Sequence, residues 1–400
     1  MNILFVTDHY TPTVNGIVRH IVSIKQELKK RGHTIYIVAP PTRKKIEKEP
    51  NVFRLPTAIP FPLKKGDLFT LPFDPRIENK LLKTPIDIVH SHLLLTGFMG
   101  IRIAQKKNIP TVVTLHTLWR HYIDWMVPWG EKKIKYRISD WAARNYFNQY
   151  DSIIAPSSKA IDALLEAKVK TPVHLIYNGI DIKTFKKAKT MDLSKLTSAT
   201  KTKRPTIIMT GRIDKGKNAD LAIRAIYKLK KQIPEVLFIM VGDGSEREKI
   251  ESLLNKYNLK NNVIITGFVD QSMIASLNKS ADVALFTSDT DTLPTVLIEA
   301  AASGKPVVSV YDKAVVDIVR HEKNGYLVPK DTQAIADALQ RLLTNQNLRK
   351  QYGIKSESIA SDFSITKNAI QLEKLYKELT DKNKIPQNRG FFSFLTTKKW

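Results

Sequence analysis

Residues 205–244 read "PTIIMTGRIDKGKNADLAIRAIYKLKKQIPEVLFIMVGDG", and the order of the parts in this stretch decides the fold. The apolar, β-branched runs at 205–210 and 235–241 are typical of buried strands, and a helical pattern lies between them. A strand, a helix and a second strand in this order indicate two parallel strands joined by a crossover helix. The stretch therefore predicts an α/β domain with a parallel sheet.

The same alternation of strand and helix patterns continues on both sides of this stretch. The further strand patterns are "NILFVT", "TIYIVAP", "DIVHSH" and "PTVVTLH" before it, and "NVIITGFV", "ADVALFTS" and "KPVVSVY" after it. A polar break rich in Lys, Thr and Ser, at about residues 186–205, separates the two series. The sequence thus predicts two doubly wound α/β domains. We expect an N-terminal Rossmann-like domain at 1–188, a C-terminal one at 189–365, a helix at 366–385 that packs back towards the N-terminal domain, and a basic aromatic tail at 386–400.

The composition is that of a soluble globular protein, with 42% hydrophobic and 26% charged residues among 400. There is no cysteine, which excludes disulfides and thiolate metal sites. The N-terminus lacks the basic front and the small-residue cleavage site of a signal peptide, and no apolar run reaches the eighteen residues of a membrane span. We therefore expect a cytoplasmic protein.

The formal net charge is +26, which indicates an acidic partner. Strongly basic chains bind nucleic acid, anionic membranes or phosphorylated ligands. The sequence contains no zinc finger, no RNA-recognition aromatic motif and no basic heptad region, so we do not expect a nucleic-acid partner.

The loop "TGRIDKGKN", which follows the first strand of the second domain, carries Arg212 and Lys217. Arg212 and Lys217 lie five residues apart, and a guanidinium fork beside an ammonium can clamp a diphosphate. The glycines Gly242 and Gly244 mark the next strand-to-helix turn, where backbone can approach a ligand. Neither feature alone is specific.

A carboxylate lies inside an apolar helical pattern in "DTLPTVLIEAAASGKPVV", residues 291–308. Pro294 suits the first turn of a helix over about 295–303, and Gly304 suits its C-terminal end. The free N–H groups of such a helix favour a phosphate ligand. Glu299, about one turn into it, could accept two hydrogen bonds from a vicinal diol such as a ribose. The alternative is a partly exposed helix residue without a ligand.

Together these stretches resemble the retaining glycosyltransferases of family 4, which have the GT-B fold of two Rossmann-like doubly wound domains facing across a cleft. The segment "DTLPTVLIE" occupies the place of the family's Glu-x7-Glu signature, and "GRIDKGKN" matches its Arg/Lys element. The other matching segments are "PTVNGIVRHIVSIKQELKKRGHTIYIVAP", "IYNGIDIKTF", "HEKNGYLVPKDTQAIADAL" and "LRKQYGIKSESI".

The resemblance implies a role for each matching residue. Arg212 and Lys217 would hold the donor diphosphate, Glu299 would bind the ribose, and His116 in "TLHTLWRHY" would contact the donor sugar. Asp291 stands near the sugar where the family usually has Glu. We expect the catalytic set to be His116, Arg212, Lys217 and Asp291, and the donor-binding set to be Gly16, Gly211, Gly242, Gly244, Val269, Leu293, Pro294, Thr295 and Glu299.

A metal ion is not expected. "Asp289-Thr-Asp291" mimics the Asp-x-Asp metal motif of the GT-A glycosyltransferases, but the Arg/Lys pair already supplies positive charge at the diphosphate. His90 and His92 read as strand-end residues, because no third ligand is evident. The resemblance implies a retaining, front-face transfer in which the leaving phosphate helps to deprotonate the acceptor. The nucleotide sugar would be a co-substrate and no cofactor would be needed.

Four of the five tryptophans lie within residues 119–141, among several lysines. Trp beside Lys suits a membrane interface, whereas an amphipathic helix with Trp in the core is the alternative. "HTLWRHY" also resembles the diacylglycerol glucosyltransferases of the family. The residues that we expect to contact the acceptor or the membrane are Trp119, Tyr122, Trp125, Trp129, Lys132, Lys133 and Lys135.

The expected function is transfer of a hexose, glucose from a UDP-linked donor, to a membrane lipid such as diacylglycerol. The partners would be the nucleotide sugar, the lipid acceptor and the anionic inner face of the cell membrane, to which the enzyme would attach peripherally. The alternatives are polysaccharide, lipid-linked oligosaccharide or phosphatidylinositol acceptors, or a non-catalytic protein that binds nucleotide sugars.

Overall fold

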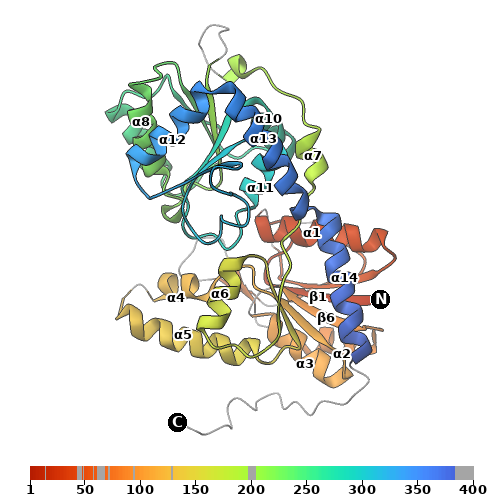
Figure 1. Ribbon diagram of the computed structural model, residues 1–400. Coiled ribbons are helices and arrows are strands. Elements are labelled where there is room, and N and C mark those ends of the chain that lie inside the picture. The colour runs from red at the N-terminus through yellow and green to blue at the C-terminus, as the bar shows by residue number, and fades with distance from the viewer. Residues whose placement is uncertain are drawn as a thin grey trace. The chain divides into compact units, whose positions relative to one another are not determined.

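A computed structural model describes residues 1–13, 15–42, 47, 49–56, 58–60, 68–70, 73–92, 95–127, 129–196 and 204–382. The chain forms two compact units (Figure 1). Unit 1 comprises Met1–Gly179 and the chain from Ile365 onward, and unit 2 comprises Ile180–Ser364. Among the described residues, no helix is long and apolar enough to cross a membrane.

Unit 1 is built on a seven-stranded sheet in the order β3-β2-β1-β6-β7-β8-β9, in which every pairing is parallel. Its strands are β1 (Asn2–Thr7), β2 (Thr34–Ala39), β3 (Val52–Arg54), β6 (Ile88–His92), β7 (Thr111–Thr114), β8 (Ser152–Ala155) and β9 (Val173–Leu175), with β4 (Ala58–Pro60) and β5 (Leu68–Thr70) as a separate antiparallel pair. Its helices are α1 (Gly16–Lys30), α2 (Pro75–Lys83), α3 (Gly97–Lys107), α4 (Trp119–Met126), α5 (Lys132–Phe147), α6 (Ser158–Glu166) and α14 (Ile365–Lys382).

The central strand β1 shows how the sheet of unit 1 is covered on both faces. Ile3 and Phe5 belong to one buried cluster with residues of α1 and α14, whereas Leu4 and Val6 belong to another with residues of α2 and α3. Successive side chains of a strand point to opposite faces, so an apolar run such as "ILFV" serves two cores at once.

Unit 2 is built on a six-stranded parallel sheet in the order β12-β11-β10-β13-β14-β15. Its strands are β10 (Thr206–Thr210), β11 (Leu237–Val241), β12 (Val263–Ile265), β13 (Val283–Phe286), β14 (Val307–Val310) and β15 (Gly325–Val328). Its helices are α7 (Ile182–Lys186), η1 (Leu193–Leu196), η2 (Lys215–Lys217), α8 (Ala219–Lys230), α9 (Arg247–Lys256), α10 (Gln271–Ser280), α11 (Thr295–Ala302), α12 (Thr332–Thr344), α13 (Gln346–Ala360) and η3 (Ser361–Phe363).

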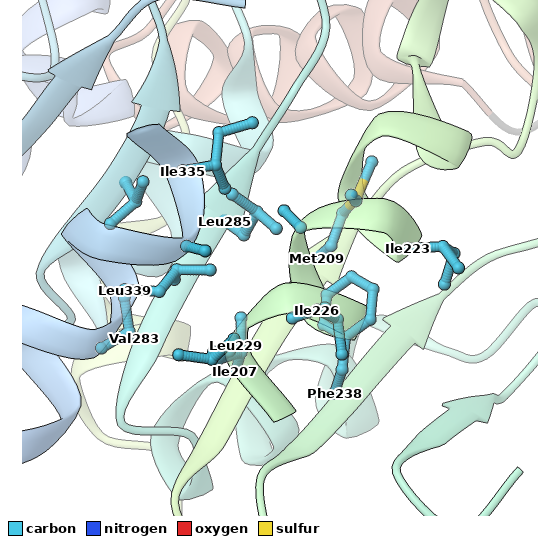
Figure 2. Close-up of a cluster of buried hydrophobic side chains, with 14 of the residues drawn as sticks. Ile207, Met209, Ile223, Ile226, Leu229, Phe238, Val283, Leu285, Ile335 and Leu339 are labelled. Carbon is cyan, nitrogen blue, oxygen red and sulfur yellow. The ribbon is translucent and has the colours of Figure 1, made fainter. Parts of the chain in front are cut away.

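The stretch that opened the sequence analysis forms β10, α8 and β11, and β10 pairs with β11 in parallel. Figure 2 shows the core that they share: Ile207 of β10, Ile226 of α8 and Phe238 of β11 lie together, with Leu285 of β13 and Leu339 of α12 nearby. These side chains are buried, and their burial is what stabilises this α/β arrangement. The predicted fold class is confirmed.

The boundary between the units differs from the predicted one. Residues 180–188 were assigned to the first domain, but the structure places them in unit 2. Phe185 of α7 is fully buried, and α7 packs against α10 and α11. The polar break is a poor guide to the boundary, because the chain changes units before it, immediately after Gly179.

The last helix, α14, packs against α1 in unit 1. Tyr376 is fully buried there, and Arg31 pairs with Glu373 at 2.7 Å between Nη2 and Oε2. Lys377 and Arg31 together lower the pKa of the Glu373 carboxyl to about 2. The aromatic tail at 386–400 lies outside the described residues.

Candidate active site

Two loops of unit 2 carry Arg212, Lys217 and Asp291, three of the residues predicted to act on the donor. β10 and β13 are parallel neighbours, so the loops that follow them, residues 211–218 and 287–294, leave the same edge of the sheet. Lys217 and Asp291 meet there: Lys217 Nζ lies 2.7 Å from Asp291 Oδ1 and 2.8 Å from Oδ2. Ser288 Oγ also donates a hydrogen bond to Asp291 Oδ2.

Further hydrogen bonds fix these two loops to each other. Thr287 Oγ1 donates to the Lys217 carbonyl at 2.8 Å, and Asn218 Nδ2 donates to the Thr287 carbonyl at 2.9 Å. A Cβ on Gly216 would come within 2.8 Å of the Thr290 side chain, so only glycine fits without a shift. The position of Lys217 is therefore set by the loop that carries Asp291.

Arg212, the second predicted diphosphate ligand, is more exposed than Lys217. Its side chain is 57% exposed, and its Nη2 lies 2.7 Å from Asp214 Oδ2. Both cations are thus on one loop, and each has a carboxylate partner. An exposed guanidinium pair of this kind is weakly held, which leaves Arg212 able to turn towards a ligand.

The predicted glycines surround the start of the same loop. Gly211 has φ +149° and open space where a Cβ would be. A Cβ on Gly242 would lie 2.0 Å from the Gly211 carbonyl oxygen, and one on Gly244 would lie 2.5 Å from the Ile213 carbonyl oxygen. In this structure the backbone that approaches Gly242 and Gly244 is therefore that of the neighbouring loop, which they allow to pack closely.

Glu299 lies on α11, one turn from its start, and is 4% exposed. The alternative of a partly exposed helix residue is therefore wrong. Burying a carboxylate costs free energy unless polar groups contact it. A residue that only filled space in the core would therefore be apolar, and Glu299 is not. Leu293 and Pro294 are also buried, and Thr295 is half-buried at the start of the helix.

The remaining donor-side residues lie at the same carboxyl edge or beside it. Val269 is half-buried and follows β12, the strand next to β11. Asp289 pairs with Lys330 at 2.7 Å, just as Asp291 pairs with Lys217. Each carboxylate of the Asp-x-Asp pattern thus has a lysine partner, and metal independence stays a prediction.

His116 of unit 1 belongs to a cluster of four buried histidines, with His20 of α1 and His90 and His92 of β6. The rings of His92 and His116 stack with centroids 5.3 Å apart, and His116 Nε2 lies 3.0 Å from His92 Nδ1. The other ring nitrogen of His116 lies 3.3 Å from Asn178 Nδ2. Both nitrogens of this predicted sugar ligand therefore have protein neighbours.

The histidine cluster is uncharged at neutral pH. Burial lowers the pKa of His20 to about 4, and burial together with the neighbouring imidazoles holds the pKa of His92 and of His116 well below the usual value. A neutral imidazole donates one hydrogen bond and accepts another. Because both nitrogens of His116 already have protein neighbours, a sugar hydroxyl could bond to this ring only by replacing His92 or Asn178.

The sequence analysis missed most of this cluster. It interpreted His90 and His92 as isolated strand-end residues and did not single out His20 or Asn178. The spacing His-x-His places both β6 histidines on one face of the strand, which was the available signal. His20 reaches them from a helix seventy residues earlier, which no local pattern shows.

Gly16, predicted to let backbone approach the diphosphate, is the first residue of α1. Asn15 caps this helix, and its side chain accepts a hydrogen bond from the Val18 N–H. The glycine is exposed at this helix start.

The residues predicted to contact the acceptor or the membrane fall into two groups, buried and exposed. Trp119, predicted as a contact residue, is buried. Its side chain is 5% exposed, and its Nε1 donates a 2.8 Å hydrogen bond to Asp140. Lys135 is also turned away from solvent, because its Nζ donates to the Val127 carbonyl and pairs with Asp124. Trp119 and Lys135 therefore hold α4 and α5 together, and neither contributes to an exposed face.

The other predicted residues are exposed or lie outside the description. Trp129 is 76% exposed, and Lys132 and Lys133 are exposed at the start of α5. Tyr122 and Trp125 lie in α4, but their side chains are outside the described residues.

Helix α5 has an exposed apolar face that the sequence analysis did not identify as such. It consists of Ile134, Ile138 and Trp141, which are each more than half exposed. Their spacing of four and three residues places them on one side of the helix, and this spacing was readable from the sequence. Exposed large apolar side chains in a row are unusual on a soluble surface.

The comparisons with known proteins cover both units. Residues 14–184 match the family model described as Glycosyltransferase Family 4, and residues 193–358 match the one described as Glycosyl transferases group 1. The chain belongs to glycosyltransferase family 4. These matches support a glycosyltransferase enzyme over the alternative of a non-catalytic binding protein.

Relatives of this glycosyltransferase cover nearly its whole length. It is 28% identical to an alpha-monoglucosyldiacylglycerol synthase of Acholeplasma laidlawii, over 97% of this chain and 100% of the relative. It is 25% identical to the synthase of the same name from Streptococcus pneumoniae, over 90% of this chain and 83% of that one. It is 23% identical to a phosphatidylinositol N-acetylglucosaminyltransferase GPI3 subunit of Saccharomyces cerevisiae, over 91% and 79%.

Solved structures confirm the GT-B fold of the glycosyltransferase. A sucrose-phosphate synthase from Thermosynechococcus elongatus superposes with a TM-score of 0.76 at 22% identity, covering 95% of this chain and 99% of that one. HepE of Anabaena in complex with UDP superposes with a TM-score of 0.73 at 20% identity, covering 95% and 100%.

Proposed function

We propose that this glycosyltransferase moves glucose from UDP-glucose to a membrane lipid acceptor such as diacylglycerol, with retention at the anomeric carbon. The observation that carries the proposal is the end-to-end alignment with an enzyme named alpha-monoglucosyldiacylglycerol synthase. A UDP-linked donor is further supported by a structural neighbour that was solved with UDP.

Unit 2 supplies the groups suited to the donor. Arg212 and Lys217 would neutralise the charge that develops on the leaving diphosphate, which is the largest single contribution that a protein makes to such a transfer. The buried Glu299 would accept hydrogen bonds from the two ribose hydroxyls. We assign the sugar hydroxyls to Asp291, and the contact of His116 with the donor sugar stays a prediction.

The transfer itself would follow a front-face course without a metal ion. The acceptor hydroxyl oxygen forms a bond to the anomeric carbon while the bond from that carbon to the diphosphate oxygen breaks. The hydroxyl proton passes to a leaving phosphate oxygen. Activity should therefore persist in EDTA, and a strict requirement for Mg²⁺ or Mn²⁺ would contradict this course.

Helix α5 is the part of unit 1 suited to a membrane surface. Its exposed face of Ile134, Ile138 and Trp141 would enter the headgroup layer, and Lys132 and Lys133 would meet anionic lipid. Attachment would be peripheral, at the inner face of the cell membrane, and the net charge of +26 would favour it.

A second candidate acceptor is phosphatidylinositol, because one relative, aligned over 91% of this chain, is named as a phosphatidylinositol N-acetylglucosaminyltransferase subunit. A screen separates the two: radiolabelled UDP-glucose, UDP-galactose and UDP-N-acetylglucosamine are each incubated with vesicles that contain either diacylglycerol or phosphatidylinositol. The labelled lipids are then resolved by thin-layer chromatography. We expect label from UDP-glucose in a diacylglycerol product, and label only in a phosphatidylinositol product would favour the second candidate.

A further inference from the structure

The ion pair between Lys217 and Asp291 joins two residues that the proposed donor site needs for different parts of the ligand. Lys217 is assigned to the diphosphate and Asp291 to the sugar, yet the ammonium contacts both carboxylate oxygens, at 2.7 and 2.8 Å. Each side chain is only about a fifth exposed, at 23% and 22%. A pair this close and this shielded is stronger than an ordinary surface pair.

The surroundings hold the pair in place from both sides. Ser288 donates to Asp291, and Thr290 Oγ1 donates to the Gly216 carbonyl at 3.2 Å, next to Lys217. The Lys217 ammonium has three N–H groups, and its two contacts to Asp291 use no more than two of them. A phosphate oxygen that bonds to the same ammonium therefore shares its positive charge with Asp291 and is repelled by the carboxylate. A bound diphosphate and Asp291 are therefore competitors for one cation.

We propose that Asp291 competes with the donor diphosphate for Lys217, and that this competition makes the enzyme prefer the nucleotide sugar over the nucleoside diphosphate product. The inference rests on the proposed function, because it takes the diphosphate to be bound at Lys217. It assigns Asp291 a specificity-determining role beyond its contact with the sugar.

The preference for the nucleotide sugar depends on which groups the Asp291 carboxylate contacts after it leaves Lys217. When the ligand is a nucleotide sugar, Asp291 leaves Lys217 but gains hydrogen bonds from sugar hydroxyls, and these offset the lost ion pair. When the ligand is the product, a nucleoside diphosphate, Asp291 leaves Lys217 and gains only water. Specificity of this kind comes from a penalty on the wrong ligand rather than from extra contacts to the right one. It also favours release of the product after each transfer.

The test compares the affinities of UDP, UDP-glucose and inorganic pyrophosphate for the full-length protein by isothermal titration calorimetry. In Asp291→Asn, which keeps the shape but removes the charge, UDP and pyrophosphate should bind roughly threefold to tenfold tighter than in wild type. UDP-glucose should gain less than UDP, because its sugar hydroxyls meet an amide in place of a carboxylate. The ratio of UDP-glucose to UDP affinity should therefore fall.

Asp289→Asn is the matched control, because Asp289 lies two residues away in the same loop and pairs with Lys330. It removes the same charge without freeing Lys217, so UDP affinity should stay at the wild-type value. A second control is the double variant Lys217→Gln/Asp291→Asn. Relative to Lys217→Gln alone, it should show no gain in UDP affinity, because the cation for which the two anions compete is absent.

The possible results separate the inference from the proposed function. If wild type binds UDP or pyrophosphate and Asp291→Asn binds them no tighter, the competition is refuted while the donor assignment stands. Equal gains in Asp291→Asn and Asp289→Asn would also refute it, since a general charge effect would then explain both. If wild type binds neither UDP nor pyrophosphate, the diphosphate assignment fails, and the inference fails with it.

Discussion

At the scale of single residues, the proposed binding of the donor depends most on Lys217. Its ammonium is positioned by the loop after β13, and its side chain is less exposed than that of Arg212, which lies on the same loop. Replacing Lys217 with Ala should lower kcat/KM for transfer by roughly a hundredfold or more, because charge on the leaving diphosphate is no longer neutralised. The measurement is the initial rate of transfer from UDP-glucose.

The control for this variant is Lys215→Ala, two residues earlier on the same short 3-10 helix. It removes the same charge without touching the pair with Asp291, so it should retain nearly the wild-type rate. A Lys217→Ala enzyme with an unchanged rate and an intact circular dichroism spectrum would remove Lys217 from the donor site.

What the sequence could predict at this scale depends on how far apart the partners lie in the chain. Arg212 and Lys217 stand five residues apart, so their pairing as a cation clamp was readable. The contact between Lys217 and Asp291 was not, because it joins loops 74 residues apart that meet only once β10 and β13 are paired. The burial of Glu299 was left open for a related reason, since helical spacing alone does not say what covers a side chain.

At the scale of elements, helices α4 and α5 divide the tryptophans between core and surface. Trp119 packs in the core and donates a hydrogen bond to Asp140, whereas Trp141 is half exposed. Trp119→Phe should destabilise unit 1 by about 1–3 kcal/mol, because the lost bond had a charged acceptor. Trp141→Phe should change stability by less than about 0.5 kcal/mol. Urea unfolding of both variants makes the comparison, and equal losses would contradict the division.

The exposed start of α5 leads to a prediction about vesicle binding. Replacing Lys132 and Lys133 with Glu should weaken sedimentation with phosphatidylglycerol vesicles, because each basic residue near anionic lipid contributes roughly 1 kcal/mol. High salt should release the wild-type protein in the same way. The matched control replaces the exposed Lys260 and Lys350 of unit 2 with Glu, and it should sediment as wild type does.

Two outcomes would count against the role of α5 in this experiment. Equal weakening by the control pair would mean that net charge alone drives binding. A wild-type protein that stays in the supernatant with anionic vesicles at low salt would favour a soluble acceptor over a membrane lipid.

The contact between α1 and α14 predicts a dependence on pH. Because Lys377 and Arg31 lower the pKa of Glu373 to about 2, this group stabilises the folded state fully above its ordinary pKa near 4.5. The stabilisation is lost as the pH falls from there towards 2. Glu373→Gln should therefore weaken amide hydrogen-exchange protection in α14 at pH 7, and the difference from wild type should shrink at pH 3. A difference that is the same at both pH values would contradict the assignment.

The sequence was a sound guide to the elements but not to their surroundings. The parallel sheets followed from apolar runs, and α5 could be anticipated from its helical spacing. The sequence could not show which face of α5 is covered. In the structure, α4 covers one side of α5 by contacts to Asp140 and Lys135 of that helix. Composition alone favoured the whole Trp/Lys segment as an interface, whereas the structure shows that Trp119 and Lys135 are turned away from solvent.

At the scale of the whole molecule, the two-domain α/β architecture was predictable because each strand-helix alternation is local. The boundary between the two units could not be predicted in the same way. The sequence offered only the polar break at about residues 186–205, whereas the chain passes from unit 1 to unit 2 directly after Gly179. A Cβ there would lie 2.6 Å from the Ile365 Cα, so the glycine allows the returning chain to pass closely. That return joins α14 to unit 1 and makes it part of the N-terminal core.

The central claim is that the chain glucosylates a lipid, and one assay tests it most directly. Purified protein is incubated with UDP-[14C]glucose and phosphatidylglycerol vesicles that contain diacylglycerol, in EDTA, and the labelled product is isolated and its anomeric configuration determined by NMR. The account predicts an α-linked monoglucosyldiacylglycerol, formed faster on anionic than on neutral vesicles and absent with Lys217→Ala. Label that appears only in a water-soluble product, or a β-linked glucolipid, would contradict it.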